Sequence, residues 1–323
     1  MFQDVYGRRI GHLRLSLTKA CAMRCTYCRP AKLSHPRNEP TLSVDEIENL
    51  VRHLAMHHGL HKVRLTGGDP TSRPELTEII GRISGVPGID DLAMTTNALT
   101  LPHRAREYAE AGLHRINVSL DTLNAERFAK LTGVDGLERV LAGLDAAEAA
   151  GLVPIRINCV VVRGQNEKDL PSLVRFAADR GFEVRFIELM PMGPLADQWA
   201  DRYVPEAQMR EQMDEVVCHW QPLEQGHDAA RRYRVVLDDG SEATVGFITP
   251  MSCNFCAACN RIRVAADGML YPCLMDKPAH TLLPALRPRF DSEQLDELIA
   301  MGLQQKRQEH PHDGFVVMTH IGG

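Results

Sequence analysis

The sequence lacks the features that direct a chain into or across a membrane. Its 323 residues contain no apolar run of about 18 residues, so we expect no membrane-spanning helix. The first residues, MFQDVYGRR, include no apolar stretch of the kind found in signal peptides. The nine cysteines are not scattered as in a secreted disulfide scaffold, because six of them fall in two tight groups. We therefore expect a cytoplasmic protein that uses cysteines as metal ligands.

An excess of positive charge is also missing. The chain has 37 Lys and Arg against 42 Asp and Glu, which gives a formal net charge of −5. This balance argues against a general nucleic-acid-binding protein, which is usually basic. An anionic substrate would need a local pocket of basic residues. The other proportions, 44% hydrophobic and 24% charged residues, suit one large globular domain or one domain with an appendage.

Strand and helix patterns alternate over the first two thirds of the chain. The expected strands are residues 12–18, 62–66, 91–95, 115–120, 155–162 and 183–187. The expected helices are residues 44–58, 75–83, 104–111, 137–150 and 167–180. Such a series predicts a parallel sheet with helices outside it. No G-x-G-x-x-G follows the first strand, so an open six-unit (β/α) partial TIM barrel fits better than a dinucleotide-binding sheet. The chemistry is then expected at the C-terminal ends of the strands.

The pattern changes after residue 193, so we divide the chain into a partial barrel (1–193) and a C-terminal region (194–323). Residues 194–225 are expected to be irregular and partly helical. Residues 232–249 and 261–273 are expected to form hairpins with Asp-Gly turns, and residues 292–308 a final helix.

The first cysteine group is Cys21, Cys25 and Cys28, spaced C-x3-C-x2-C directly after the first expected strand. Three thiolates on one loop can hold three irons of a [4Fe–4S] cluster and leave the fourth iron open. A structural zinc loop is the alternative, although zinc normally takes four ligands.

The second group is Cys256, Cys259 and Cys273, spaced C-x2-C-x13-C across the second hairpin. This region also predicts a metal centre, either an iron–sulfur cluster or a zinc site with Cys253 as a fourth ligand. Arg261 and Arg263 lie two apart in the same loop. Guanidinium groups bind phosphate in a planar, bidentate manner, so a nucleoside triphosphate is a plausible ligand.

The first triplet resembles the signature of the radical S-adenosylmethionine (SAM) superfamily. The wider match runs through RLSLTKACAMRCTYC, LTGGDP, TTNA, NVSLDTL, RFIELMP and CNRIR, and ends at the terminal Gly-Gly. Over nearly its whole length the chain resembles the GTP 3′,8-cyclase family of molybdenum-cofactor biosynthesis. The resemblance implies two [4Fe–4S] clusters and a 5′-deoxyadenosyl radical that takes the ribose 3′-hydrogen of GTP. The product would be 3′,8-cyclo-7,8-dihydro-GTP.

The resemblance also implies partners. Cyclic pyranopterin monophosphate synthase would take the product, and a flavodoxin or ferredoxin would donate electrons. A homodimer is possible, and neither a nucleic acid nor a membrane is expected as a partner.

The resemblance assigns roles to individual residues. The two cysteine triplets would hold the clusters, and SAM would contact Tyr27, Gly68, Ser119 and Met190. Strand-to-helix turning is an alternative role for Gly68, and core packing for Met190. GTP would be bound by a mainly basic set: Arg14, Arg64, Thr95, Arg156, Arg261 and Arg263. Arg14, Gly322 and Gly323 would act in catalysis, the two glycines as a tail that enters the pocket.

Four positions depart from the family pattern. Asp69 stands in place of a common glutamate, Ala98 in place of a glycine, Arg29 in place of a methionine and Arg156 in place of a lysine. Two other readings remain open: a radical SAM peptide-modifying maturase with an auxiliary cluster, and a non-enzymatic zinc or electron-carrier protein.

Overall fold

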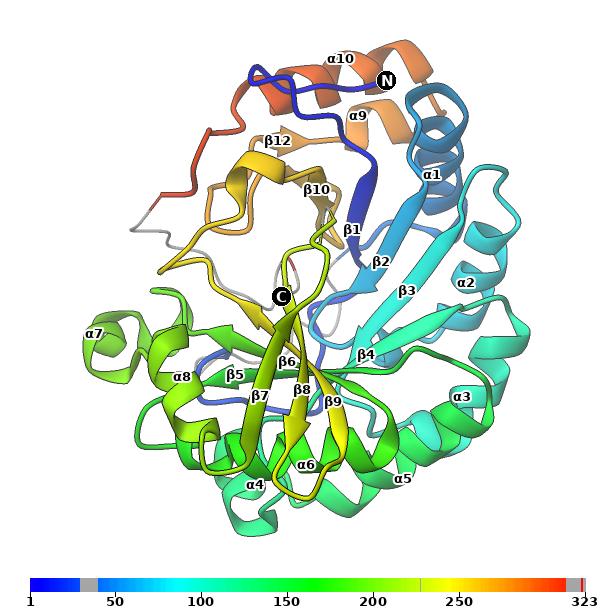
Figure 1. Cartoon of the computed structure of the whole chain (residues 1–323). Coiled ribbons are helices and arrows are strands. Elements are labelled where there is room, and N and C mark those ends of the chain that lie inside the picture. Colours follow the sequence, from blue (N-terminus) through cyan, green and yellow to red (C-terminus); the bar gives the residue numbers. More distant parts are fainter. Residues whose placement is uncertain (30–39, 227, 312–320, 322–323) are drawn as a thin grey trace.

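The computed structural model describes residues 1–29, 40–226, 228–311 and 321. A 12-stranded sheet runs through it in the order β12-β11-β10-β1-β2-β3-β4-β5-β6-β9-β8-β7. Figure 1 shows this sheet curving around a central space, with the helices of the first two thirds of the chain on its outer side.

The first six strands are parallel neighbours in chain order, which confirms the predicted partial barrel. They are β1 (His12–Ser16), β2 (Lys62–Thr66), β3 (Asp91–Thr96), β4 (Arg115–Ser119), β5 (Arg156–Val161) and β6 (Glu183–Glu188). Along these strands apolar side chains alternate with polar or charged ones, and most residues of both kinds are buried or partly buried.

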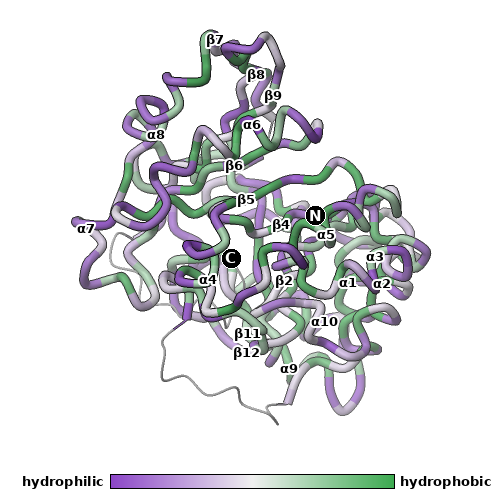
Figure 2. Tube along the Cα trace, turned by 90° about the horizontal axis from the view of Figure 1, so that it is seen from below, coloured by the Kyte–Doolittle hydropathy of each residue, from purple (hydrophilic) through white to green (hydrophobic). Residues whose placement is uncertain are grey.

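The helices between the strands lie close to their predicted positions. They are α1 (Val44–His58), α2 (Leu76–Ser84), α3 (Leu101–Glu110), α5 (Leu137–Ala149) and α6 (Leu170–Arg180). The helix α1 begins and ends where its sequence predicts, because Ser43 and Glu46 form a capping box and Gly59 takes a left-handed conformation, φ 72°. Figure 2 shows these helices alternating between hydrophilic and hydrophobic segments, as expected when one side of a helix packs on a sheet.

The helix α4 (Ala125–Thr132) was not predicted. Its eight residues begin after Asn124, whose side chain accepts a hydrogen bond from the backbone N–H of Arg127. Phe128 and Leu131 are buried against the core.

The C-terminal part of the chain adds strands to both edges of the same sheet. At one edge, β9 (Glu242–Ile248) pairs parallel with β6 and is followed by antiparallel β8 (Arg231–Leu237) and β7 (Val217–Pro222). At the other edge, β10 (Arg261–Val264) pairs parallel with β1 and is followed by antiparallel β11 (Met269–Tyr271) and β12 (His280–Thr281).

Both predicted hairpins are therefore confirmed, as β8–β9 and β10–β11. The strand β7 lies in a stretch expected to be irregular, where most of its side chains are exposed and only the first is buried. The same stretch contains α7 (Trp199–Arg202) and α8 (Glu206–Met213). The chain continues through α9 (Leu283–Leu286) to α10 (Ser292–Gln304), which ends earlier than residue 308. Among the described residues, none of the helices has the length and apolar character needed to span a bilayer.

Candidate active site

A cavity of about 520 Å³ lies inside the curved sheet, and both cysteine triplets line it. Most of the predicted site residues also line this cavity: Arg14, Tyr27, Arg64, Gly68, Thr95, Ser119, Met190, Arg261 and Arg263. Residues from distant parts of the chain are thus brought to one cavity.

The two triplets stand at opposite ends of the strands. Cys21 follows the C-terminal end of β1, whereas Cys259 precedes β10, whose first residue Arg261 pairs with His12 at the start of β1. The expectation that all the chemistry lies at the C-terminal ends is therefore wrong for the second triplet. From His12 to Ser16, β1 spans about 13 Å at ~3.3 Å per residue, so the cavity extends along the full length of the strands.

The first cysteine loop is held in place by the unpredicted helix α4. The backbone N–H of Arg24 donates to Thr132 O at 2.7 Å, and that of Thr26 donates to Leu131 O at 2.9 Å. Cys28 N donates to Cys25 O at 3.0 Å and closes a turn. These bonds fix the loop between β1 and the end of α4.

Tyr27, within the same loop, reaches the end of β4. Its hydroxyl donates to Asp121 Oδ2 at 2.7 Å, while Asp121 Oδ1 accepts from Val160 N at 2.9 Å. Burial raises the pKa of Asp121 to about 6 and that of Tyr27 well above its ordinary value. The pair fixes the tyrosine ring in the cavity wall beside the cysteines.

Little positive charge lies near the partly buried thiols of the first triplet. Burial raises the pKa of Cys21 to about 11 and that of Cys28 to about 12, and neighbouring thiols and carboxylates add to the effect. Such groups ionise readily only beside a cation, so a positively charged iron core suits them as ligands.

The spacing of the sulfur atoms separates a cluster from a single ion. Among the described residues, neither triplet brings all three sulfur atoms within 4.8 Å of one another. A tetrahedral zinc ion, with Zn–S bonds of ~2.3 Å, would hold its sulfur ligands about 3.8 Å apart. Binding of one zinc ion by either triplet would therefore require its sulfur atoms to move closer together.

The second triplet is assembled by the β10–β11 hairpin, as predicted. Lys306 Nζ donates to Arg261 O at 3.0 Å and to Pro272 O at 2.6 Å, so one ammonium group joins the two sides of the hairpin next to Cys259 and Cys273. Burial alone would raise the pKa of Cys259, but Arg261 and Lys306 lower it to about 6. Cys253 is exposed and is not among the residues that line the cavity.

A row of guanidinium groups crosses three neighbouring strands between the triplets. The register pairs Arg14 of β1 with Arg64 of β2 on one side and with Arg263 of β10 on the other. Burial lowers the pKa of Arg64 to about 9 and that of Arg263 to about 10, and the neighbouring arginines add to the effect. Arg64 Nε is buried without a hydrogen-bond partner. Three guanidinium groups side by side make this part of the wall strongly basic, so the cavity is suited to a polyanion.

The remaining predicted residues lie nearer the first triplet. Gly68 N donates to Thr18 O at 2.7 Å, and a Cβ at Gly68 would lie 2.3 Å from Ala20 O. Gly68 therefore serves the strand-to-helix turn, because the end of β2 and the cysteine loop approach each other too closely for a side chain. Thr95 Oγ1 is buried in the wall without a hydrogen-bond partner, and Ser119 and Met190 line the wall at later strand ends.

One predicted residue does not line the cavity, and two lie where the structure is not described. Arg156 is not among its lining residues, and Arg156 Nε instead donates to Glu183 Oε2 at 3.2 Å on the next strand. Gly322 and Gly323 lie outside the described residues. Ile321, directly before them, is fully buried in a cluster with Met192, which lines the cavity.

Three departures from the family pattern are buried. Asp69 accepts hydrogen bonds from Thr71 N at 2.9 Å, Asn97 N at 2.6 Å and Thr96 Oγ1 at 3.0 Å. Ala98 is fully buried in a left-handed conformation, φ 64°, a region that favours glycine. Arg29 is buried beside the first triplet.

Sequence reasoning missed several charged residues of the site. Arg185 of β6 lines the cavity with Asp228, and Arg185 Nη2 donates to Asp228 Oδ2 at 2.8 Å. A charged residue within a predicted parallel strand is itself a signal, and it would have found Arg185. Lys306 and Asp228 carry no comparable signal, because each lies in an ordinary polar segment.

Glu188 at the end of β6 was missed as well. Its carboxylate accepts from Met251 N at 3.0 Å, Ser252 N at 2.9 Å and Tyr203 Oη at 3.0 Å. This one buried side chain fixes the segment that leads into the second cysteine group.

Known proteins resemble the chain over nearly its whole length. The sequence pattern of the Radical SAM superfamily matches residues 15–177, and that of Molybdenum Cofactor Synthesis C matches residues 182–312. A GTP 3′,8-cyclase of Pelotomaculum thermopropionicum is 43% identical over 312 residues, which cover 95% of this chain and 94% of that protein. One from Pseudomonas putida is 38% identical over 310 residues, 95% of this chain and 92% of that protein.

Solved structures confirm the fold. Streptococcus suis SuiB, bound to its precursor peptide SuiA, superposes with a TM-score of 0.63 at 14% identity, over 94% of this chain and 75% of that chain. A radical SAM enzyme carries a [4Fe–4S] cluster and uses SAM, for which the first triplet is suited. The extent and identity of the sequence matches place this chain in the radical SAM superfamily and, within it, in the GTP 3′,8-cyclase family.

Proposed function

We propose that the protein converts GTP to 3′,8-cyclo-7,8-dihydro-GTP in the first step of molybdenum-cofactor biosynthesis. The observation that carries the proposal is the row of Arg64, Arg14 and Arg263 between two cysteine triplets at opposite ends of one cavity. The negative charge of a nucleoside triphosphate complements this basic row. The cavity that contains the row would also hold the ribose and the base.

The first triplet is the site at which SAM reacts. When bound there, a reduced [4Fe–4S] cluster supplies the electron that cleaves SAM to a 5′-deoxyadenosyl radical. Tyr27 is held by Asp121 beside this site, and Gly68, Ser119 and Met190 lie at the same ends of their strands. These residues position SAM against the end of the nucleotide that faces them, with the reacting carbon and hydrogen in contact.

The arginine row positions the substrate. Guanidinium groups are fixed by their strands and are already desolvated, so binding requires little rearrangement of the wall. Arg156 and the Gly-Gly tail keep their predicted roles as substrate-contacting and catalytic groups.

In our proposal Cys256, Cys259 and Cys273 would hold another [4Fe–4S] cluster, which would offer an open iron to the guanine. The thiol spacing, together with the low pKa of Cys259 beside Arg261 and Lys306, supports this assignment. Cyclic pyranopterin monophosphate synthase is the proposed recipient of the product, and a flavodoxin or ferredoxin the proposed electron donor.

The test is anaerobic incubation with GTP, SAM and dithionite, followed by mass spectrometry of the nucleotides. We expect the amounts of 5′-deoxyadenosine and of the cyclised nucleotide to rise together. Formation of 5′-deoxyadenosine without loss of GTP would contradict the proposal, as would stoichiometric zinc in place of iron.

Matched variants test the arginine row. Arg64→Gln or Arg263→Gln removes one charge-assisted contact of ~1.5–3 kcal/mol, so GTP binding should weaken roughly ten- to a hundredfold. SAM binding should hardly change. Arg106→Gln, on the exposed side of α3, removes the same charge far from the cavity and should leave both affinities unchanged. Equal loss of GTP and SAM binding in Arg64→Gln would instead indicate a folding role.

A further inference from the structure

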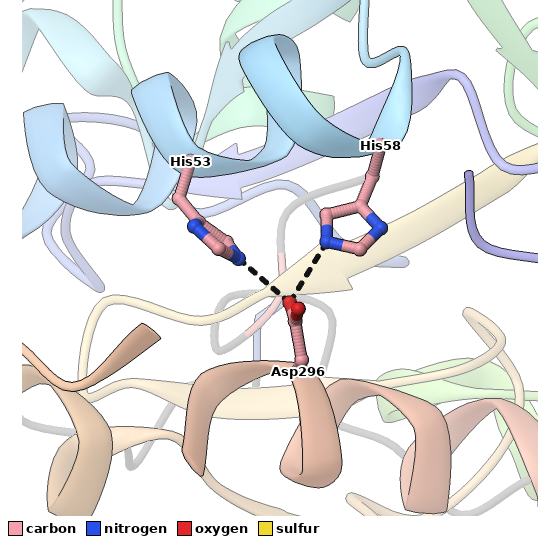
Figure 3. A group of neighbouring side chains, drawn as sticks. All are labelled: His53, His58 and Asp296. Carbon is pink, nitrogen blue, oxygen red and sulfur yellow. Dashed lines mark hydrogen bonds and ion pairs between the residues drawn. The ribbon is translucent and has the colours of Figure 1, made fainter. Parts of the chain in front are cut away.

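Three side chains outside the cavity converge on one point between α1 and α10. His53 Nε2 lies 2.6 Å and His58 Nε2 2.8 Å from the same oxygen, Oδ1 of Asp296. The two imidazole nitrogens and the carboxylate oxygen all lie within 4.8 Å of one another. Figure 3 shows both rings turning from α1 toward the carboxylate on α10.

The hydrogen bonds available here do not satisfy this group. His53 Nε2 makes a hydrogen bond to Asp296, but neither nitrogen of the largely buried His58 has a hydrogen-bond partner. His58 Nε2 instead lies 2.8 Å from Asp296 Oδ1, the oxygen that is already hydrogen-bonded to His53. Two imidazole nitrogens therefore share one carboxylate oxygen, an arrangement that a metal ion between the three atoms would satisfy.

Packing holds both rings in their present orientation. The ring of Phe2 stacks on His58 with a centroid distance of 3.8 Å and an angle of 9° between the planes. Phe290 meets His53 edge-on at 5.8 Å. Side chains fixed in this way lose little conformational freedom when they bind an ion.

We propose that His53, His58 and Asp296 bind a divalent transition-metal ion of the zinc class. Imidazole nitrogen and carboxylate oxygen are common ligands of Zn²⁺, with three protein ligands leaving a fourth position for water. Bonds of ~2.0–2.2 Å to each ligand require the three donor atoms to move about 0.6 Å further apart. Asp296 is 40% exposed, so the ion and its water can enter from its side.

The position of the site indicates a structural role. None of the three residues lines the active-site cavity. His53 and Asp296 are 243 positions apart, and they join the outer helix α1 of the barrel to the last helix described in the C-terminal region. An ion bound here links the two parts of the chain at a point away from the chemistry.

The experiment uses the anaerobically reconstituted holoenzyme, dialysed against micromolar ZnCl₂, with zinc and iron counted by mass spectrometry. We expect one zinc ion per chain in addition to the full iron content. His58→Gln and Asp296→Asn should each weaken zinc binding at least about tenfold while the iron content stays constant. His103→Gln, at an exposed histidine of α3, is the matched control and should bind zinc as the wild type does.

A thermal measurement separates the metal site from an ordinary histidine–carboxylate contact. Zinc should raise the apparent melting temperature of the wild type and of His103→Gln, but not that of Asp296→Asn. Asp296 is partly exposed, so this variant should fold even where a histidine variant does not. Equal zinc binding by the wild type and by both site variants would overturn the proposal. A wild-type protein that contains its full iron content but binds no zinc would overturn it as well.

Discussion

Arg8 provides a sharp test of how the second cysteine group is held. Its Nη1 donates to Cys256 O at 2.7 Å and its Nη2 to Arg307 O at 2.6 Å, so one N-terminal side chain reaches two distant segments. Its Nε donates to Asp4 Oδ2 at 2.5 Å, and the Asp4 side chain is fully buried. We predict that Arg8→Gln releases Cys256 and leaves the Asp4 carboxylate without its cation.

The magnitude follows from which groups water can reach. The contact with Arg307 is exposed, so that carbonyl is rehydrated at little cost. The contacts with Cys256 and Asp4 are partly buried, and each hydrogen bond from a charged group contributes ~1.5–3 kcal/mol. The expected destabilisation is about 3–5 kcal/mol, which lowers the apparent melting temperature by roughly 6–15 °C.

The assay is iron analysis with thermal unfolding, both performed anaerobically. If both triplets hold cubanes, iron should fall from about eight toward about four per chain, with SAM cleavage retained at the first triplet. Arg9→Gln is the matched control, because Arg9 is exposed next to Arg8. Adding Asp4→Asn to Arg8→Gln should recover part of the stability, since it removes the unpaired carboxylate. An Arg8→Gln protein with normal iron content and unchanged melting would refute the reasoning.

Four further predictions concern the barrel. Glu188→Gln places amide hydrogens against backbone donors such as Ser252 N, so it should lower the free energy of unfolding in denaturant by ~2–4 kcal/mol. A decrease below about 1 kcal/mol would show that these hydrogen bonds contribute little. Ala98→Gly should change stability by less than about 1 kcal/mol, because relief of left-handed strain offsets the lost methyl group and the added chain entropy. The Cβ introduced by Gly143→Ala would lie 2.5 Å from Ala98 O, so this variant should lose ~1–3 kcal/mol of unfolding free energy in the same assay. Similar denaturant midpoints for Gly143→Ala and Ala98→Gly would show that the backbone can relax this contact. Burial raises the pKa of Asp121 to about 6, above its unfolded value of ~3.9, so its contribution to stability is complete at low pH and is lost as pH rises through 6. Relative to Asp121→Asn, the wild type should gain about 1.5 kcal/mol in unfolding free energy between pH 8 and pH 5, and a difference independent of pH would contradict the assignment.

The strands and helices of the barrel could be predicted because their signals are local. The capping box at Ser43 and Glu46 and the left-handed Gly59 determine where α1 begins and ends. The helix α4 was missed because its eight residues give only two turns of pattern. The strand β7 was missed because most of its side chains are exposed, so it lacks the alternation that a half-buried strand shows.

The candidate site likewise contains residues that a local sequence signal reveals and residues that it does not. Both cysteine triplets could be found because their spacing is compact in sequence, and the hairpin that joins Cys259 to Cys273 has a recognisable turn. Lys306 could not be found, because its bonds to Arg261 and Pro272 span 45 and 34 positions. Arg156 could be found from its position in a motif, but its contact could not. A motif position alone does not reveal that the side chain pairs with Glu183.

The opposite placement of the two cysteine triplets has a simple topological origin. Each triplet begins in a connection next to one of two paired strands, the first after β1 and the second before β10. Because β10 pairs parallel with β1, a segment that follows one strand and a segment that precedes the other must lie at opposite ends of the pair. An antiparallel β10 would have placed both triplets at the same end, with no arginine row between them. The parallel register of His12 with Arg261 and of Arg14 with Arg263 therefore does two things at once. It sets the length of the cavity, and it aligns the guanidinium groups across it.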